Sequence, residues 1–237
     1  MSYIILFSAV IIGVLIGELI KPQETLKKLF LTFSGAFLLA VTVFHILPEV
    51  YINGNEKIGF FIMLGVFIQI LLEFISKGVE HAHVPNHHGH SHEKHSYTLP
   101  MFISISIHAF LEGAPVTDHA HHHHIIDEIS NPVLLGVFIH KIPIASIIYV
   151  AFRENGYSKI ISFLLIILFG LMTPAGSYLA NKVPAVIQYS DQINAVVIGI
   201  FLHISTTILF ESSSGHKFNS AKLLVITAAT ALVYFSY

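Results

Sequence analysis

The feature that most constrains this chain is a series of apolar runs, each about as long as a helix that crosses a lipid bilayer. Eight runs of 18 to 22 residues cover 3–20, 28–47, 58–77, 98–117, 132–151, 159–180, 190–211 and 219–236. A helix needs about 20 apolar residues to cross a hydrocarbon core of roughly 30 Å. The sequence therefore predicts an all-α integral membrane protein with eight transmembrane helices.

The composition leaves little material for a surface in water. Charged residues make up 11% of the chain, whereas a soluble domain carries about 25%. The runs use about two thirds of the sequence, so we expect residues 1–237 to form a single transmembrane domain. The first run has neither a basic segment before it nor a small-residue cleavage site, so we expect a span and not a signal peptide.

Basic residues are distributed unevenly between the two sets of connections that eight spans create. One set contains Lys21, Lys27, Lys28, Lys77, Lys94, Arg153, Lys159, Lys217 and Lys222. The other set contains only Lys57 and Lys182. Because lysine and arginine are retained on the cytoplasmic side, we expect the first set to be cytoplasmic. Both termini would then lie outside a cell membrane, plasma or inner.

Histidine is concentrated in two of the connections. The predicted cytoplasmic loop 79–97 contains His81, His83, His87, His88, His90, His92 and His95. The predicted outer loop 118–131 contains His119, His121, His122, His123 and His124. Imidazole suits first-row transition metals, and biased histidine tracts are typical of flexible, weak metal binders. We therefore expect both loops to gather metal ions, with solvated linkers as the alternative. Whether the loops regulate transport or only buffer metal ions stays open.

Three potential metal ligands lie in the interior of predicted spans. His108 is the eleventh residue of 98–117, Glu112 follows one turn later on the same helix face, and His140 is the ninth residue of 132–151. Each costs at least ~2.5 kcal/mol at mid-bilayer and marks a functional site by default. The two spans are consecutive and antiparallel, so both histidines reach the same depth. The sequence contains no cysteine, and these three residues are the predicted ligands of a divalent cation.

Two prolines lie close to these ligands. Pro115 cannot donate a hydrogen bond to the carbonyl of Leu111, and Pro143 cannot donate one to Ile139. Freed carbonyls are tolerated in a membrane where they line a polar cavity, and discontinuous helices at a midplane site are typical of transporters. Helix kinks that serve packing alone are the alternative.

Five further polar residues are candidate accessory or pathway positions. His45 and Glu49 lie one turn apart at the outer end of the second span, either in an entry vestibule or at an ordinary helix end. His203 lies within the seventh span, where a hydrogen bond to another helix is favoured over metal binding. Glu73 and Glu211 lie at the predicted cytoplasmic ends of spans three and seven. Contact with water is favoured for Glu211, and Glu73 is undecided between an exit path and water.

With these residues in place, the sequence resembles the ZIP family of divalent metal transporters. The resemblance rests on "HAFLEG" (108–113), "HKIPIA" (140–145), "LMTPAG" (171–176), "GIFLHISTTILFE" (199–211) and "HILPE" (45–49). These are similar to the patterns of the family's fourth, fifth, sixth, seventh and second helices. The paired fourth- and fifth-helix motifs are specific, whereas the others are weak alone.

The resemblance implies a transport site at His108, Glu112 and His140. It also implies a 3+2+3 arrangement, in which helices 1–3 and 6–8 are inverted repeats and helices 4 and 5 lie between them. The sequence supports the repeat faintly, because "GAFLLAVTVFHILPE" and "GIFLHISTTILFE" share Gly-x-Phe-Leu and both end in Glu.

The sequence departs from two patterns that together build a two-metal centre in many members: Asn after the first histidine of helix 4, and His-Glu-x-Pro-His-Glu on helix 5. Ala109, Lys141, Ile144 and Ala145 occupy positions of that two-metal centre, as in the branch with lysine after the helix-5 histidine. Lys141 is too central to reach either surface easily, so we expect it either to be neutral or to pair with a carboxylate inside the bundle, Glu112 being the nearest by depth. We therefore predict a single ion at the midplane, with Lys141 as a fixed positive charge that is relieved of its carboxylate partner when the metal ion binds.

The expected function is uptake of a divalent metal ion from outside to cytoplasm, Zn²⁺ first, with Fe²⁺ and Mn²⁺ as alternatives. The expected partners are the ion and the lipid bilayer; a homodimer stays open. We expect no nucleic-acid partner, no enzyme activity and no enzyme cofactor. No nucleotide-binding motif is present, so gradients would supply the energy for alternating access.

Two other functions fit the same residues. A membrane metallo-hydrolase would need a general base and an open coordination position for water, and the sequence has no HExxH motif. An efflux carrier would differ in the direction of flux.

Deletion of residues 81–95 is expected to preserve metal uptake and to change its apparent affinity or regulation. A flexible loop gathers ions but cannot form a gated path. Uptake by proteoliposomes measures this, and complete loss of flux in a well-inserted deletion variant would make the loop part of the path.

Overall fold

The structure is a computed structural model that describes residues 2–20, 24–53, 56–76, 98–116, 131–211 and 220–236. Every regular element in these ranges is helical. The histidine tracts 81–95 and 118–124 lie outside the described residues, so the predictions made for them stay predictions.

The helices follow one another along the chain with two π-helical turns, η1 and η2. In order they are α1 (Ser2–Leu15), η1 (Ile16–Ile20), α2 (Glu24–Val41), η2 (Thr42–Ile46), α3 (Leu47–Asn53), α4 (Ile58–Ser76), α5 (Thr98–Leu111), α7 (Pro132–Glu154), α8 (Lys159–Lys182), α9 (Pro184–Ile187), α10 (Ser190–Glu211) and α11 (Ser220–Phe235).

Six helical segments among the described residues are long and apolar enough to cross a membrane. They are Ser2–Leu19, Thr25–Ile52, Ile58–Ser76, Pro132–Glu154, Lys159–Lys182 and Ser190–Phe210. Two of the eight predicted spans correspond to shorter apolar helices, Leu99–Leu111 and Ser220–Phe235. The all-helical class is thus confirmed for the described residues, with six helices that could span a membrane, while the eight spans stay a prediction.

The second and fourth predicted spans differ most from the helices of the structure. The second, expected over 28–47, is part of a longer unit because α2, η2 and α3 follow one another without a break from Glu24 to Asn53. The fourth, expected over 98–117, ends as an α-helix at Leu111. Pro115 has no backbone N–H, so it cannot donate the helical hydrogen bond to the carbonyl of Leu111, four residues before it. The chain instead turns over residues 112–115.

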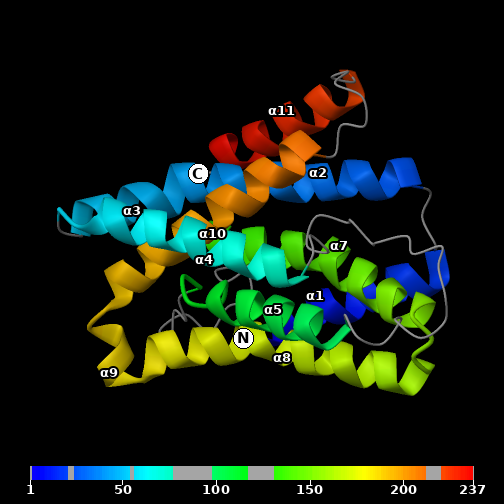
Figure 1. Ribbon diagram of the computed structural model, residues 1–237. Helices are drawn as coiled ribbons and strands as arrows, with labels where there is room; N and C mark the ends of the chain where they lie inside the picture. The colour runs from blue at the N-terminus through cyan, green and yellow to red at the C-terminus, as the bar shows by residue number, and fades with distance from the viewer. Residues whose placement is uncertain are drawn as a thin grey trace.

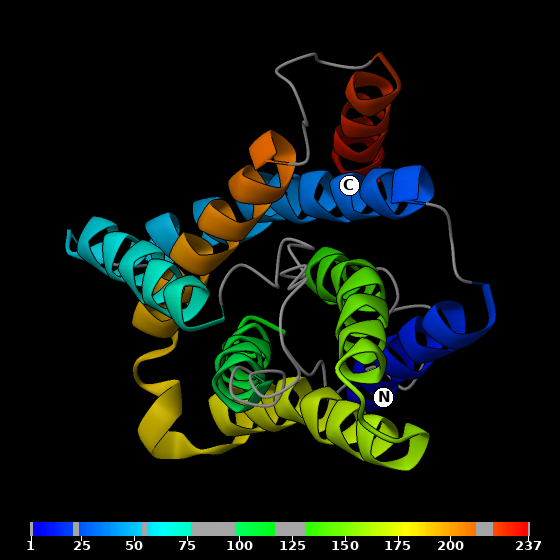
Figure 2. The same ribbon diagram turned by 45° about the vertical axis from the view of Figure 1, so that its right-hand side comes forward.

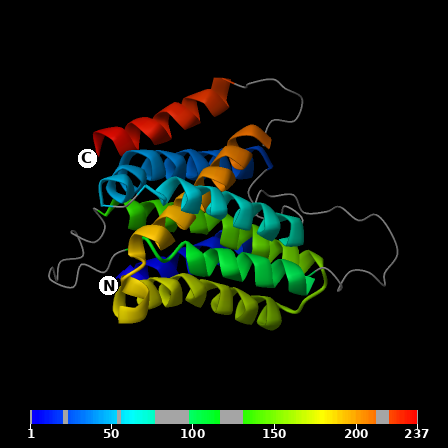
Figure 3. The same ribbon diagram turned by 60° about the vertical axis from the view of Figure 1, so that its left-hand side comes forward.

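The helices pack as a bundle several layers deep. From one edge to the other, Figure 1 shows α8, then α5, α1 and α7, then α4, α10 and α2, and finally α11. Figure 3 shows the start of α1 and the end of α11 on the same side of the bundle, and the junction of α7 and α8 on the other. Consecutive long helices therefore run in alternating directions.

Local signals in the sequence fix the position of α7. The Asn131 side chain accepts hydrogen bonds from the backbone of Val133 (2.9 Å) and Leu134 (3.2 Å), and Pro132 occupies the first helical position. The helix ends just before Gly156, which has a φ of +88°. These signals place His140 and Lys141 at the start of the longest unbroken run of buried residues in α7, 140–146.

Glycines allow α4 and α10 to approach until their backbones touch. A Cβ atom at Gly65 would lie 1.9 Å from the carbonyl oxygen of Val196, and one at Gly199 would lie 2.0 Å from that of Ile62. Membrane helices associate through close packing of small residues, because lipid tails remove the hydrophobic drive between them. The two glycines therefore set the spacing of this helix pair.

Gly199→Ala is expected to destabilise the protein by about 1–3 kcal/mol or more, because the new methyl group overlaps backbone atoms that cannot rotate away. Thermal unfolding in detergent measures the change. Gly59→Ala is the matched control, since its Cβ would meet only the Tyr51 hydroxyl at 3.8 Å. Equal melting temperatures for the two variants would contradict the packing argument.

Candidate metal centre

The three predicted ligands converge in the interior of the bundle. His108 lies near the end of α5, Glu112 lies in the turn directly after it, and His140 lies in α7. One ligand atom from each lies within 4.8 Å of the other two. The backbone bond from Glu112 N to His108 O (3.0 Å) continues the helical ladder past α5 and keeps the carboxylate one turn above the imidazole.

The geometry is close to that of a coordination sphere. His108 Nε2 lies 3.3 Å from Glu112 Oε2, and two ligands bound tetrahedrally at about 2.0–2.1 Å lie roughly 3.3–3.4 Å apart. The three ligand atoms are separated by up to 4.8 Å, which is more than the distance between two ligand atoms bound to one such ion. A small inward movement of one side chain would therefore complete a three-ligand set. Two imidazoles and one carboxylate suit Zn²⁺ and other first-row divalent ions.

The centre is closed to solvent. His108 and His140 are 1% exposed, Glu112 is 2% exposed and Lys141 is 1% exposed. Glu112 is the one acidic residue that is fully buried, among those whose burial the structure describes. An ion held here would exchange with water only after the helices rearrange.

The two oxygens of Glu112 have different neighbours. Oε2 faces His108, whereas Oε1 forms an ion pair with the Lys141 ammonium and accepts a hydrogen bond from Thr173 Oγ1 at 2.9 Å. The same hydroxyl lies 2.7 Å from the carbonyl of Ala109, so its proton is shared between two acceptors. The predicted pairing of Lys141 with Glu112 is therefore confirmed.

Helix α8 holds the turn that carries Glu112. Ser177 Oγ donates to the Val116 carbonyl at 2.8 Å, and Asn181 Nδ2 donates to the same oxygen at 2.9 Å. Gly113 and Gly176 let the two backbones touch: a Cβ at Gly113 would lie 2.1 Å from Thr173 O, and one at Gly176 would lie 1.8 Å from Phe110 O. Figure 2 shows α5 lying against α8.

An aromatic ring lies on the other side of the Lys141 ammonium. The Nζ atom lies 4.8 Å from the centroid of the Phe169 ring, within the range of a cation–π contact. Phe169 precedes Thr173 by four residues, so both project from one face of α8. The ammonium thus lies between a carboxylate and an aromatic face.

The two prolines near the ligands behave differently. Helix α7 continues through Pro143 without a break, so the expected discontinuity of this helix is wrong. Helix α5 does end before Pro115, and the Leu111 carbonyl accepts a bond from Ala114 N at 3.0 Å. That carbonyl is therefore satisfied by a tighter turn and is not left for an ion.

The predicted entry residues lie apart from the three-ligand group. His45 is half-buried within η2, and Glu49 is exposed on α3. Neither belongs to the metal-competent cluster found among the described residues.

His203 and Glu73 pair with each other. His203 Nε2 on α10 lies 2.6 Å from Glu73 Oε2 on α4, and their side chains are 19% and 25% exposed. The favoured interpretation of His203, a hydrogen bond to another helix, is confirmed. On α5, Ser104 Oγ donates to the carbonyl of Leu72 at 2.6 Å, so this pair lies beside the helix that carries His108. Glu211 is the last residue of α10, and its side chain lies outside the description.

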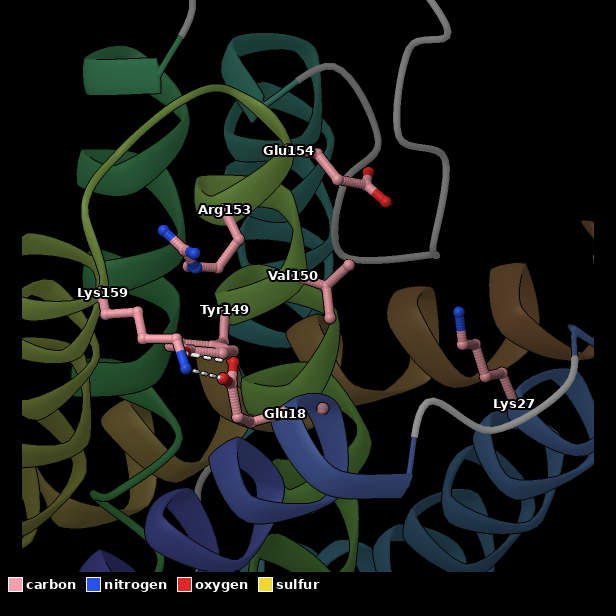
Figure 4. Close-up of a pocket in the computed structure, with 8 residues that line it drawn as sticks. Glu18, Lys27, Tyr149, Val150, Arg153, Glu154 and Lys159 are labelled. Atoms are coloured by element: carbon pink, nitrogen blue, oxygen red, sulfur yellow. Dashed lines mark hydrogen bonds and ion pairs between the residues drawn. The ribbon is translucent and has the colours of Figure 1, made fainter.

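A cavity of about 560 Å³ lies where η1, α7 and α8 meet. Figure 4 shows Glu18 at its wall: Oε2 accepts a hydrogen bond from the Tyr149 hydroxyl at 2.9 Å, and Oε1 pairs with the Lys159 ammonium. Lys27 and Arg153 also line the cavity, and all three basic residues belong to the predicted cytoplasmic set.

An apolar layer separates this cavity from the metal centre. Tyr149 follows Lys141 by eight residues, which corresponds to about 12 Å along a helix axis. The apolar layer belongs to one cluster of buried apolar side chains from four helices, which reaches the metal centre at Ala109 and Phe169 and also contains Val10, Val14, Ile105, Ile144, Ala145, Ile148 and Ile166. On α7, Ile144, Ala145 and Ile148 of this layer thus lie between Lys141 and the cavity, which we call the vestibule.

The sequence analysis missed three residues with a role at these sites. Thr173 and Phe169 contact the ion pair, but their importance depends on how α8 docks against α5, which no local pattern encodes. Glu18 could have been predicted from the sequence, because the free-energy cost of an acidic side chain in an apolar run makes it a functional candidate.

Comparisons with known proteins add no identification. No protein-family model matches the chain, and no curated protein sequence matches it.

Glu112→Gln is expected to lower the free energy of unfolding by about 3–5 kcal/mol, because it leaves the buried Lys141 ammonium without its carboxylate. Removing both charges, in Glu112→Gln combined with Lys141→Met, should restore most of the loss. Thermal melting of the two single variants and the double variant measures the coupling. Additive losses would show that the two charges do not depend on each other.

Proposed function

We propose that this chain is a ZIP-like permease that moves a divalent metal ion, with Zn²⁺ as its principal cargo, from outside to cytoplasm. The observation that carries the proposal is the buried group of His108, Glu112 and His140 in a bundle of membrane-length helices. This donor set suits a divalent ion, and a buried intramembrane cluster of this kind marks an ion path.

The closed centre fits an occluded state of alternating access. The ligands are shielded from solvent, and apolar side chains of α7 lie between them and the vestibule beside Glu18. Because the vestibule is lined by basic residues of the predicted cytoplasmic set, it would be the inner mouth. Opening of the apolar layer would then connect the centre to the cytoplasm.

The helix contacts favour the 3+2+3 arrangement with eight spans. In that scheme α1, the α2–α3 unit and α4 form one repeat, α8, α10 and α11 form the other, and α5 and α7 lie between them. An inverted repeat makes the contact between α4 and α10 equivalent to the contact between α11 and α2. It likewise makes the contact between α1 and α7 equivalent to the contact between α8 and α5. All four contacts are present. The shorter helices α5 and α11 would complete the set of spans.

A metallo-hydrolase is less well supported by the same centre. It needs a general base and room for a water molecule on the metal. The Lys141 ammonium and the Thr173 hydroxyl, which lie beside the ligands, are both engaged with Glu112. Zinc-dependent turnover in liposomes without metal flux would favour the enzyme, and outward flux would favour an efflux carrier.

The proposed function is tested by metal uptake into proteoliposomes across a panel that includes Zn²⁺, Fe²⁺ and Mn²⁺. Inward flux of at least one ion, driven by its own gradient, is the expected result. An inserted and folded protein that moves no ion of the panel would overturn the proposal.

His108→Ala and His140→Ala are each expected to abolish uptake and metal binding, because an ion at a dry site cannot replace a lost ligand with water. Glu112→Ala should do the same, and it is best made together with Lys141→Met so that no unpaired ammonium remains. Uptake and isothermal titration calorimetry measure the effects. His203→Ala, which removes a histidine from a different helix pair, is the matched control and should keep binding at the centre. Near-normal transport by any two of the three ligand variants would remove these residues from the transport site.

A further inference from the structure

The charge of the metal centre is already balanced without a metal ion. Glu112 supplies one negative charge and the Lys141 ammonium supplies one positive charge, in direct contact and 1–2% exposed. A divalent ion added to this arrangement would bring two further positive charges into a buried site, a few ångströms from an ammonium. Charges in a low-dielectric interior interact far more strongly than in water, so the ion and the ammonium compete for one carboxylate.

We propose that Lys141 is a resident counter-cation of the carrier: its ammonium neutralises Glu112 while the site is empty, and it moves onto the Phe169 ring when a metal ion binds. The proposal rests on the proposed function and adds the property that the empty centre can close as readily as the loaded one. Lys141 is thus a positioning residue that acts through Glu112.

Of the two partners, Glu112 is the one that is held in place. Its side chain is short, it follows the end of α5, and the backbone there is fixed to α8 by the Gly113 and Gly176 contacts and by the bonds to Val116. Thr173 also holds Oε1 at 2.9 Å. Lys141 reaches the same oxygen from α7 on a flexible four-carbon stem. An incoming ion would therefore displace the ammonium and leave the carboxylate where it is.

The Phe169 ring is the alternative partner of the displaced ammonium. Its ring centroid already lies 4.8 Å from Nζ, so a small rotation of the stem exchanges the carboxylate for the aromatic face. A cation over an aromatic ring away from water is stabilised by the ring quadrupole. The charge then stays inside the protein and needs no path to the surface.

The counter-cation determines whether an empty carrier can return. Without Lys141, the empty site would hold a buried carboxylate with no opposite charge, which is strongly unfavourable. Such a carrier would close only around an ion. It would exchange ions between the two sides but would not reset empty, so net uptake would stop.

The binding experiment compares the wild type, Lys141→Met and Lys141→Arg in lipid nanodiscs by calorimetric titration with Zn²⁺. Loss of the competing cation in Lys141→Met should tighten zinc binding about tenfold or more, and Lys141→Arg should stay near the wild type. Lys222→Met is the matched control, because Lys222 is also buried but bonds to the carbonyl of Leu209. Its binding should not change. Unchanged or weaker binding by Lys141→Met would overturn the proposal.

The transport experiment separates net uptake from exchange in proteoliposomes. Lys141→Met should lose net uptake into a zinc-free lumen by about tenfold or more, while isotope exchange across zinc-loaded membranes stays within about twofold of the wild type. Equal loss of both would indicate a structural defect and would overturn the proposal. A wild-type protein that neither binds nor moves any ion refutes the proposed function itself, whereas the failures named above leave that function standing.

Phe169→Leu provides a second test that leaves the ion pair intact. It should weaken zinc binding about fivefold, since the ring is the main partner of the displaced ammonium but only a secondary partner of the ammonium that is paired with Glu112. In the Lys141→Met background the same substitution should have no effect, because there is no ammonium to accommodate. An equal effect in both backgrounds would show that Phe169 acts without Lys141 and would overturn its assigned part.

Discussion

The ion pair between Lys141 and Glu112 is the interaction on which the interior of this protein depends. It joins α7 to the turn after α5, and Thr173 extends it to α8. A buried pair is weak evidence for stability as such, because both charges lose their hydration on folding. Its clearer effect is on specificity: a shift of α7 by one residue would replace Lys141 with His140 or Ile142 opposite the carboxylate. The pair therefore fixes the register in which the two histidines face each other.

The sequence predicts the metal centre from two kinds of regularity. The four-residue spacing of His108 and Glu112 places them on one helix face, and the length of the spans places His140 at equal depth in the next helix. The structure brings the three together, although their role as metal ligands stays a prediction. The pairing of Lys141 was predictable from free energy, because a charged lysine in the middle of a membrane span is tolerated only with a partner.

What the sequence does not predict depends on contacts between helices that are distant along the chain. The pairing of Glu73 with His203 joins residues 130 positions apart, and Thr173 meets Glu112 across 61 positions. Apolar helices look alike from their composition, so no local pattern selects their neighbours. The early end of α5 was also missed, because an apolar run continues past Leu111 and conceals the turn that Gly113 and Pro115 permit.

The backbone contact between α5 and α8 limits how the protein can move. With Gly113 against Thr173 O and Gly176 against Phe110 O, the two chains interlock without intervening side chains. Helices whose backbones touch resist sliding along each other because backbone atoms would collide, and they resist separation because the bonds from Thr173, Ser177 and Asn181 would break. They must travel as one rigid block that carries Glu112, His108 and Thr173 together. The motion left to the centre is a change in the angle between that block and α7. Opening would then be a hinge motion that separates His108 and Glu112 on the block from His140 and Lys141 on α7.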